Sequence, residues 1–183
     1  MSGIIGAGSK SGVIGNRIFS NVDRWRLTAN DDVGGIIVPW VRIFGNVTPS
    51  NHDANTMGVN IGAAMTESGG EFTFPSTGCW WILLHCELQG SSLTSRYNNG
   101  SITATDDDFS TDNEIAVSRT AFQNSGIGYV NVSVHCDVFY YVKDLANQKV
   151  KIMAGAENLS VDIRGVGSTL GDETTLTFIK VGD

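Results

Sequence analysis

The eight residues from Cys79 to Cys86, CWWILLHC, are almost wholly apolar on both faces of any strand that they form. Alternation along such a strand gives one face Cys79, Trp81, Leu83 and His85, and the other face Trp80, Ile82, Leu84 and Cys86. In a sheet of antiparallel strands one face normally meets water, so a strand that is apolar on both faces needs a second covering surface. Another copy of the chain supplies that surface most simply. The sequence therefore predicts oligomerisation.

The composition favours an all-β protein. Among 183 residues there are 22 glycines, only 3 prolines and 17% charged residues, which suits many strands joined by tight turns. The length fits one domain with an extension, and we expect a domain over 23–183 that follows an arm over 1–22. Strand signals recur about every ten residues, as in a sandwich or barrel. The expected strands are 24–28, 36–44, 57–64, 71–75, 79–88, 95–104, 114–121, 128–142, 148–154 and 174–181.

Several function classes do not fit this sequence. The formal net charge is −7 and no run of Lys or Arg occurs, so no nucleic-acid partner is expected. Neither a secretory signal nor an apolar run long enough for membrane insertion is present. No Gly-X-Ser-X-Gly elbow occurs, so we expect no enzyme and no catalytic residues. The three cysteines are expected to be reduced, buried thiols, with Cys79 and Cys86 on opposite strand faces.

The first fifteen residues contain an imperfect repeat, SGIIG at 2–6 and SGVIG at 11–15. Glycine at this density does not hold a helix, yet paired aliphatic residues are unusual in a plain linker. We expect an anchoring arm that becomes ordered when four side chains enter a groove on a partner. These side chains are Ile4, Ile5, Val13 and Ile14.

The clearest two-residue period runs from Tyr129 to Val142. Its aliphatic face, Val130 to Val142 on the even positions, belongs in a sandwich core. Its other face mixes aromatic and polar residues, which is typical of a surface between subunits because tyrosine combines a large buried area with a hydroxyl group. The residues expected at the subunit interface are Trp81, Leu83, His85, Tyr129, His135, Phe139 and Tyr141.

One local motif resembles a C1q-like (C1q/TNF) domain. It comprises GEFTFP at 70–75, the turn to Gly78, the pair Trp80-Trp81 and the strand that ends at His85. The segment TTLTFIKVG at 174–182 looks like the last strand of that fold. The resemblance covers residues 23–183. It implies a ten-stranded jelly-roll sandwich that forms a homotrimer about a three-fold axis.

The chain departs from the animal members of that family because it has neither a collagen-like stalk nor a secretory signal. The stretch DRWRLT at 23–28 and the GIIG opening resemble small structural proteins of tailed bacteriophages, particularly marine ones. The resemblance implies a non-enzymatic virion protein, either a capsid decoration or a head or tail fibre component. It would be synthesised in the host cytoplasm, attached through its arm and partnered by other virion proteins of capsid or tail. Its position on the particle stays open.

The alternative is a receptor- or glycan-binding fibre head or tail tip that mediates host attachment. Loops such as 91–99 or 106–112 would then contact a glycan or protein of the host surface. Exposed tryptophans can stack on sugar rings, and the chain has four of them, Trp25, Trp40, Trp80 and Trp81.

Two clusters raise the question of a metal. The acidic stretch Asp106, Asp107, Asp108, Asp112 and Glu114 can offer oxygen ligands to Ca²⁺, but it lacks the spacing of an EF-hand, so a solvated loop is expected. His85-Cys86 and His135-Cys136 each point to opposite faces of a strand, so neither pair binds a metal locally. A cross-strand pairing of His85 with His135 stays open. We expect no cofactor and no metal.

Overall fold

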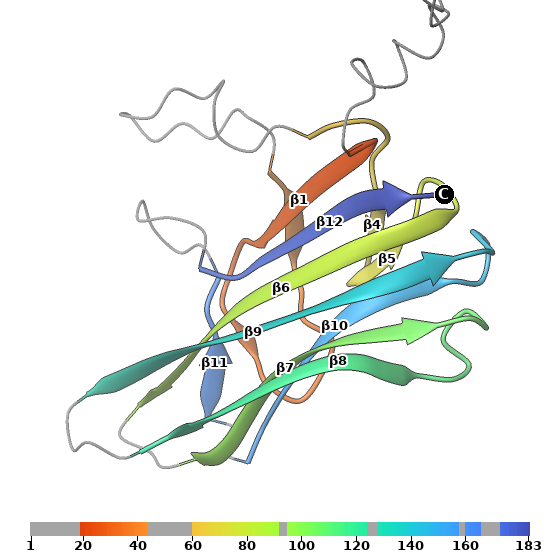
Figure 1. Ribbon diagram of the computed structural model, residues 1–183. Coiled ribbons are helices and arrows are strands. Elements are labelled where there is room, and N and C mark those ends of the chain that lie inside the picture. The colour runs from red at the N-terminus through yellow and green to blue at the C-terminus, as the bar shows by residue number, and fades with distance from the viewer. Residues whose placement is uncertain (1–18, 44–59, 92–94, 124–127, 158–159, 166–172) are drawn as a thin grey trace, which may run out of the picture.

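The computed structural model describes residues 19–43, 60–91, 95–123, 128–157, 160–165 and 173–183. Over these residues the chain forms two antiparallel sheets packed face to face, with no helix (Figure 1). The larger sheet, sheet A, contains β1 (Asn21–Leu27), β2 (Asp31–Asp32), β3 (Trp40–Arg42), β6 (Gly78–Ser91), β9 (Tyr129–Val142), β11 (Val161–Ile163) and β12 (Thr175–Gly182). Sheet B contains β4 (Thr66–Ser68), β5 (Glu71–Thr73), β7 (Ser95–Thr105), β8 (Asn113–Phe122) and β10 (Lys149–Ala156).

Strand β6 is the central strand of sheet A. It pairs with β9 along its whole length, from Gly78 opposite Val142 to Ser91 opposite Tyr129. On its other edge it pairs first with β12 and then with β11. Buried and half-buried residues alternate strictly from Cys79 to Gly90, so the two faces predicted for this segment are confirmed.

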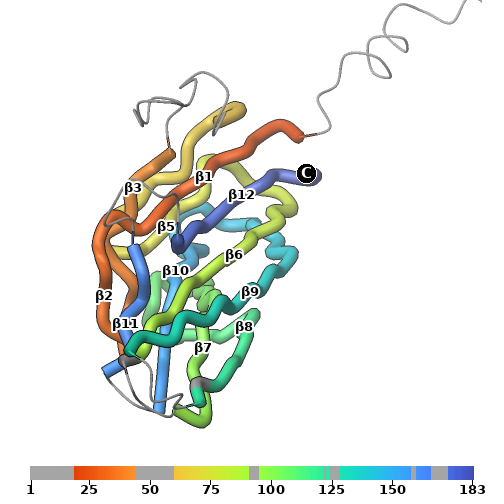
Figure 2. The backbone as a smooth tube through the Cα atoms, turned by 90° about the vertical axis from the view of Figure 1, so that its left-hand side faces the viewer, coloured from red at the N-terminus to blue at the C-terminus, as the bar shows by residue number. Residues whose placement is uncertain are grey.

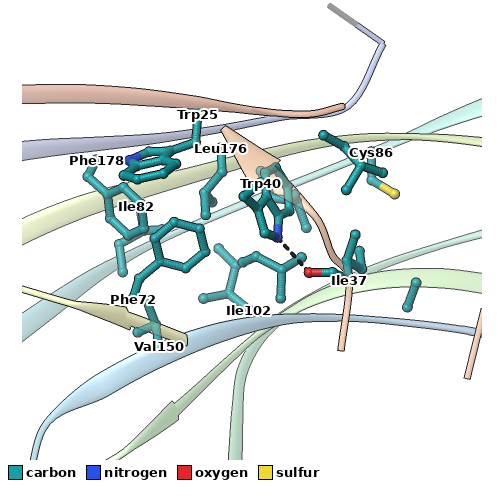
Figure 3. Close-up of a cluster of buried hydrophobic side chains, with 14 of the residues drawn as sticks. Trp25, Ile37, Trp40, Phe72, Ile82, Cys86, Ile102, Val150, Leu176 and Phe178 are labelled. Atoms are coloured by element: carbon teal, nitrogen blue, oxygen red, sulfur yellow. Dashed lines mark hydrogen bonds between the residues drawn. The ribbon is translucent and has the colours of Figure 1, made fainter. Parts of the chain in front are cut away.

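The core lies between the inner faces of the two sheets (Figure 3). The ring of Phe72, on β5, lies 5.3 Å from that of Trp25, 5.9 Å from that of Trp40 and 5.2 Å from that of Phe178. The indole Nε1 of Trp40 donates a hydrogen bond of 2.6 Å to the carbonyl of Ile37. Trp25, Trp40 and Trp80 are all buried, so these three rings are not exposed for stacking on sugars.

Three short strands, β2, β4 and β11, were not expected, and one expected strand is shorter than predicted. Of 36–44 only Trp40–Arg42 is a strand; Ile36 makes a single bridge to Met153, and the Val38–Pro39 peptide bond is cis. The strand expected over 57–64 lies partly outside the described residues, and Ile61 makes one bridge to Val22. Strands of two or three residues are too short to show an alternating pattern.

The carboxylate of Asp23, on β1, binds groups from β3 and from the segment before β4. It is 1% exposed, accepts bonds of 2.6 Å from both Nε and a terminal nitrogen of Arg42, and also accepts the Met65 amide at 2.8 Å. The ion pair joins β1 to β3, and the amide bond joins β1 to the segment before β4. Bidentate, charge-assisted bonds of this kind are strong and geometrically specific.

The first residues of β1 and the last residues of β12 lie at the same end of the sandwich. Asn21 pairs with Lys180 in the antiparallel ladder between these strands. Both views place the start of β1 beside the C-terminus (Figures 1 and 2).

Gly78, at the first position of β6, cannot carry a side chain without cost. Its φ is +121°, and a Cβ built there would lie 2.4 Å from the carbonyl oxygen of Gly182. We expect Gly78→Ala to lower the free energy of unfolding by about 2 kcal/mol or more, because backbone strain and overpacking add. Urea denaturation checks this value. Gly35→Ala is the control, since nothing lies within 4 Å of its Cβ, and an equal loss in both variants would contradict the explanation.

Candidate functional site: the outer face of sheet A

One broad face of sheet A points away from the core, and we call it the outer face. Its strands are β9, β6, β12 and β1, in that spatial order. Its residues are Tyr129, Asn131, Ser133, His135, Asp137, Phe139 and Tyr141 from β9, Cys79, Trp81, Leu83, His85, Glu87 and Gln89 from β6, Thr175, Thr177 and Ile179 from β12, and Val22, Arg24 and Arg26 from β1. All seven residues expected at a subunit interface lie on this face.

An apolar row crosses the outer face. Phe139 stacks on Trp81 with ring centroids 5.7 Å apart and an interplanar angle of 22°. The ladder continues from Trp81 to Ile179, and from Ile179 to Val22. Phe139 is 63% exposed and its neighbour Tyr141 is 51% exposed. Contiguous apolar side chains left in water in this way are typical of a surface that binds another protein.

The indole of Trp81 already has its polar partner within the chain. Its Nε1 donates a bond of 2.8 Å to Oδ2 of Asp137, on β9. The indole is therefore held in place against Phe139, on which it stacks. An aromatic ring that is already fixed loses little side-chain entropy when it is covered.

His85 and His135 lie directly opposite each other in the β6–β9 ladder. Their rings are stacked, with centroids 4.3 Å apart. Burial lowers the pKa of His85, the neighbouring His135 and Arg24 lower it further, and Glu87 opposes them. Nε2 of His85 is buried and has no hydrogen-bond partner. The cross-strand pairing that the sequence left open is therefore present.

The outer face becomes polar beyond the histidines. Glu87 accepts a hydrogen bond from the hydroxyl of Ser133, and Gln89 donates one of 2.7 Å to Asn131. Tyr129, at the end of β9, is 71% exposed. The face thus has an apolar half and a hydrogen-bonding half.

The charges on the outer face are segregated by sign. The acidic residues Glu87 and Asp137 lie on β6 and β9, whereas Arg24 and Arg26 lie on β1. Sequence reasoning missed the contributions of β1 and β12 to this face. The alternation of buried and half-buried residues in NVDRWRL, at 21–27, is the signal that reveals them.

Two carboxylates of the acidic cluster at 106–114 form ion pairs with lysines. Asp108 forms an ion pair with Lys149, and Asp112 pairs with Lys151 at 2.7 Å. Asp107 accepts bonds from the Thr105 hydroxyl and the Thr111 amide, which lower the pKa of its carboxyl group. No group of three or more His, Cys, Asp or Glu side chains in the described part of the chain is arranged to hold a metal ion.

The three cysteines are free thiols. Burial raises the pKa of Cys86 to about 12 and that of Cys136 to about 11. Both side chains lie on inner faces, opposite Val134 and Leu84 respectively, whereas Cys79 lies on the outer face. Because the thiolate is the reactive form, Cys86 and Cys136 are inert at neutral pH.

The arm residues Ile4, Ile5, Val13 and Ile14 lie outside the described residues, as does His52. Within the described ranges no helix is long and apolar enough to cross a membrane.

Comparisons with known proteins identify the fold. No family model matches the chain, and no curated protein matches it. Among solved structures it is similar to Eiger TNF from S. frugiperda, with a TM-score of 0.61 at 8% identity over 88% of this chain and 92% of that one. It is also similar to murine APRIL, with a TM-score of 0.56 at 12% identity over 87% of this chain and 98% of that one. The fold is a C1q/TNF-like jelly roll. At these identities the likeness concerns the jelly roll alone.

Proposed function

We propose that the chain is a non-enzymatic structural protein that assembles through its outer face into a homotrimer. The observation that carries the proposal is the aromatic row on that face, with Phe139 and Tyr141 more than half exposed. Covering such side chains contributes roughly 25 cal/mol for each Å² of apolar surface removed from water. The opposite, inner face of sheet A is already covered by sheet B.

A second copy of the chain is the occupant that the charges favour. When one copy's β9 edge lies on the β1 side of the next copy, Glu87 and Asp137 approach Arg24 and Arg26 of that neighbour. A contact between two different patches repeats around an axis and closes into a ring when the rotation between neighbouring copies completes a full turn. The number three comes from the C1q/TNF resemblance.

Light scattering coupled to size-exclusion chromatography tests the assembly. We expect a particle of about three times the chain mass of 19.6 kDa at micromolar concentration. A stable, monodisperse single chain under those conditions contradicts the proposal.

We further propose that the trimer is a component of a bacteriophage virion, either a capsid decoration or a part of a head or tail fibre. The support is the likeness of DRWRLT and of the GIIG opening to such proteins. Once one arm of a trimer is bound, the other two arms have a high effective concentration near their sites. A weak contact for each arm is therefore enough for stable attachment to the particle.

Replacing Ile4, Ile5 and Ile14 with serine tests the arm. We expect the trimer to form unchanged while its attachment to particles is lost, because the apolar contact of each arm is removed and the loss is multiplied by three. Quantitative mass spectrometry of purified particles measures occupancy. Normal occupancy with the triple variant refutes the anchoring role. The receptor-binding alternative stays a prediction, since no described feature favours it over assembly.

A further inference from the structure

The two histidines of the outer face lie close enough to each other to act as two ligands for one ion. His85 and His135 come from adjacent strands, and their ring centroids are 4.3 Å apart with an interplanar angle of 25°. Two imidazole nitrogens that bind one zinc ion at about 2.0–2.1 Å lie roughly 3 Å from each other. The rings as they stack have nearly parallel planes, so each must turn about its side-chain bonds until one nitrogen of each points at a common ion, while the direct opposition of the two residues in the β6–β9 ladder keeps both within reach of it.

The pair also contains an unused donor atom. Nε2 of His85 is buried and no hydrogen-bond partner satisfies it. A buried polar atom without a partner costs about 1–3 kcal/mol. A neutral imidazole carries a lone pair on one ring nitrogen, which a metal ion can accept. A bound ion would give Nε2 the partner that it lacks.

We propose that His85 and His135 together bind a divalent transition-metal ion of the zinc and nickel class. Imidazole nitrogen suits these ions, whereas Ca²⁺ and Mg²⁺ require sets of oxygen ligands. The nearest carboxylates on the face are engaged, since Glu87 accepts a bond from Ser133 and Asp137 accepts one from Trp81. Water therefore completes the coordination sphere. The site is exchangeable and does not resemble a closed structural zinc centre.

Both ligands belong to one copy of the chain, so metal binding does not require assembly. The metal site and the trimer can therefore be tested separately. The variant Phe139→Arg/Tyr141→Arg is designed to be monomeric, and its nearer substitution lies four residues from His135 along β9, which is about 13 Å.

Isothermal titration of the metal-stripped, full-length protein with NiCl₂, and in parallel with ZnCl₂, tests the site. We expect one ion for each chain and no heat with CaCl₂. His85→Gln and His135→Gln should each weaken binding at least tenfold, because a single imidazole remains. The matched control is His52→Gln, which changes the third histidine of the chain and should leave affinity within twofold. His135 is exposed, so its variant keeps the test valid if His85→Gln fails to fold.

Proton NMR gives a readout that does not depend on affinity. Zn²⁺ is diamagnetic, and we expect it to shift the imidazole signals of His85 and His135 and to leave that of His52 in place. Binding that survives His135→Gln unchanged, or that disappears in His52→Gln, overturns the proposal. If the Phe139→Arg/Tyr141→Arg variant still binds the metal ion, the metal site is supported whether or not the chain forms a trimer. If that variant does not bind the ion, the claim that one chain provides the whole site is overturned.

Discussion

Replacing Phe139 and Tyr141 with arginine is expected to convert the trimer into single folded chains. Both side chains are more than half exposed in one chain, so the substitutions leave the core of that chain intact. In the assembly they would be buried, and removing an aromatic anchor from an interface costs about 2 kcal/mol or more. Two such losses, with two new charges, raise the dissociation constant by about a hundredfold or more. Sedimentation over a range of concentrations measures the change.

Tyr97→Arg is the matched control for this experiment. Tyr97 is 50% exposed, but it lies on β7 in sheet B, away from the outer face. We expect the control to remain assembled and to melt at the same temperature as the parent. If both variants dissociate equally, added charge explains the result and the outer face is not the interface.

Removing the carboxylate of Asp23 is expected to destabilise the fold strongly. Asp23→Ala leaves the Arg42 guanidinium, 17% exposed, without its bidentate partner and leaves the Met65 amide without an acceptor. Breaking one half of a buried ion pair lowers the free energy of unfolding by about 3–5 kcal/mol. Chemical denaturation followed by tryptophan fluorescence measures the loss, because Trp25 packs within the same part of the core.

An exposed ion pair provides the comparison. Glu157 pairs with Arg96, whose side chain is 84% exposed. Solvent screens an exposed pair of this kind, so Glu157→Ala should change the free energy of unfolding only slightly. Similar losses in the two variants would show that burial does not determine the value of the Asp23 pair.

The sequence predicts long strands well because they show a pattern. The alternation over 129–142 and 79–88 gives both strands, their faces and the residues that these two strands contribute to the outer face. The all-β class, predicted from composition and strand spacing, and the jelly-roll sandwich, implied by the C1q/TNF resemblance, are both confirmed. The short strands β2, β4 and β11 have no such pattern, and their pairing depends on which longer strand lies beside them.

The pairing of His85 with His135 shows where sequence reasoning stops. Each residue's face follows from alternation, but their direct opposition depends on register, which the turn and the core set together. The lysines that neutralise Asp108 and Asp112 are a second example. Lys149 and Lys151 lie about forty residues further along the chain, and only the packing of β10 beside β7 brings them near. The charge pattern alone predicted a solvated acidic loop, with calcium as the alternative.

Because β1 begins and β12 ends at the same end of the sandwich, the two ends of the molecule are not equivalent. Any tether that pulls on the residues before Asn21 holds the sandwich by the end that also carries the C-terminus. The opposite end, where β6 leads into β7 and β8 leads into β9, then points outward from whatever surface bears the tether. Cargo fused after Asp183 would sit crowded against that surface, whereas an epitope inserted at the far end would be displayed.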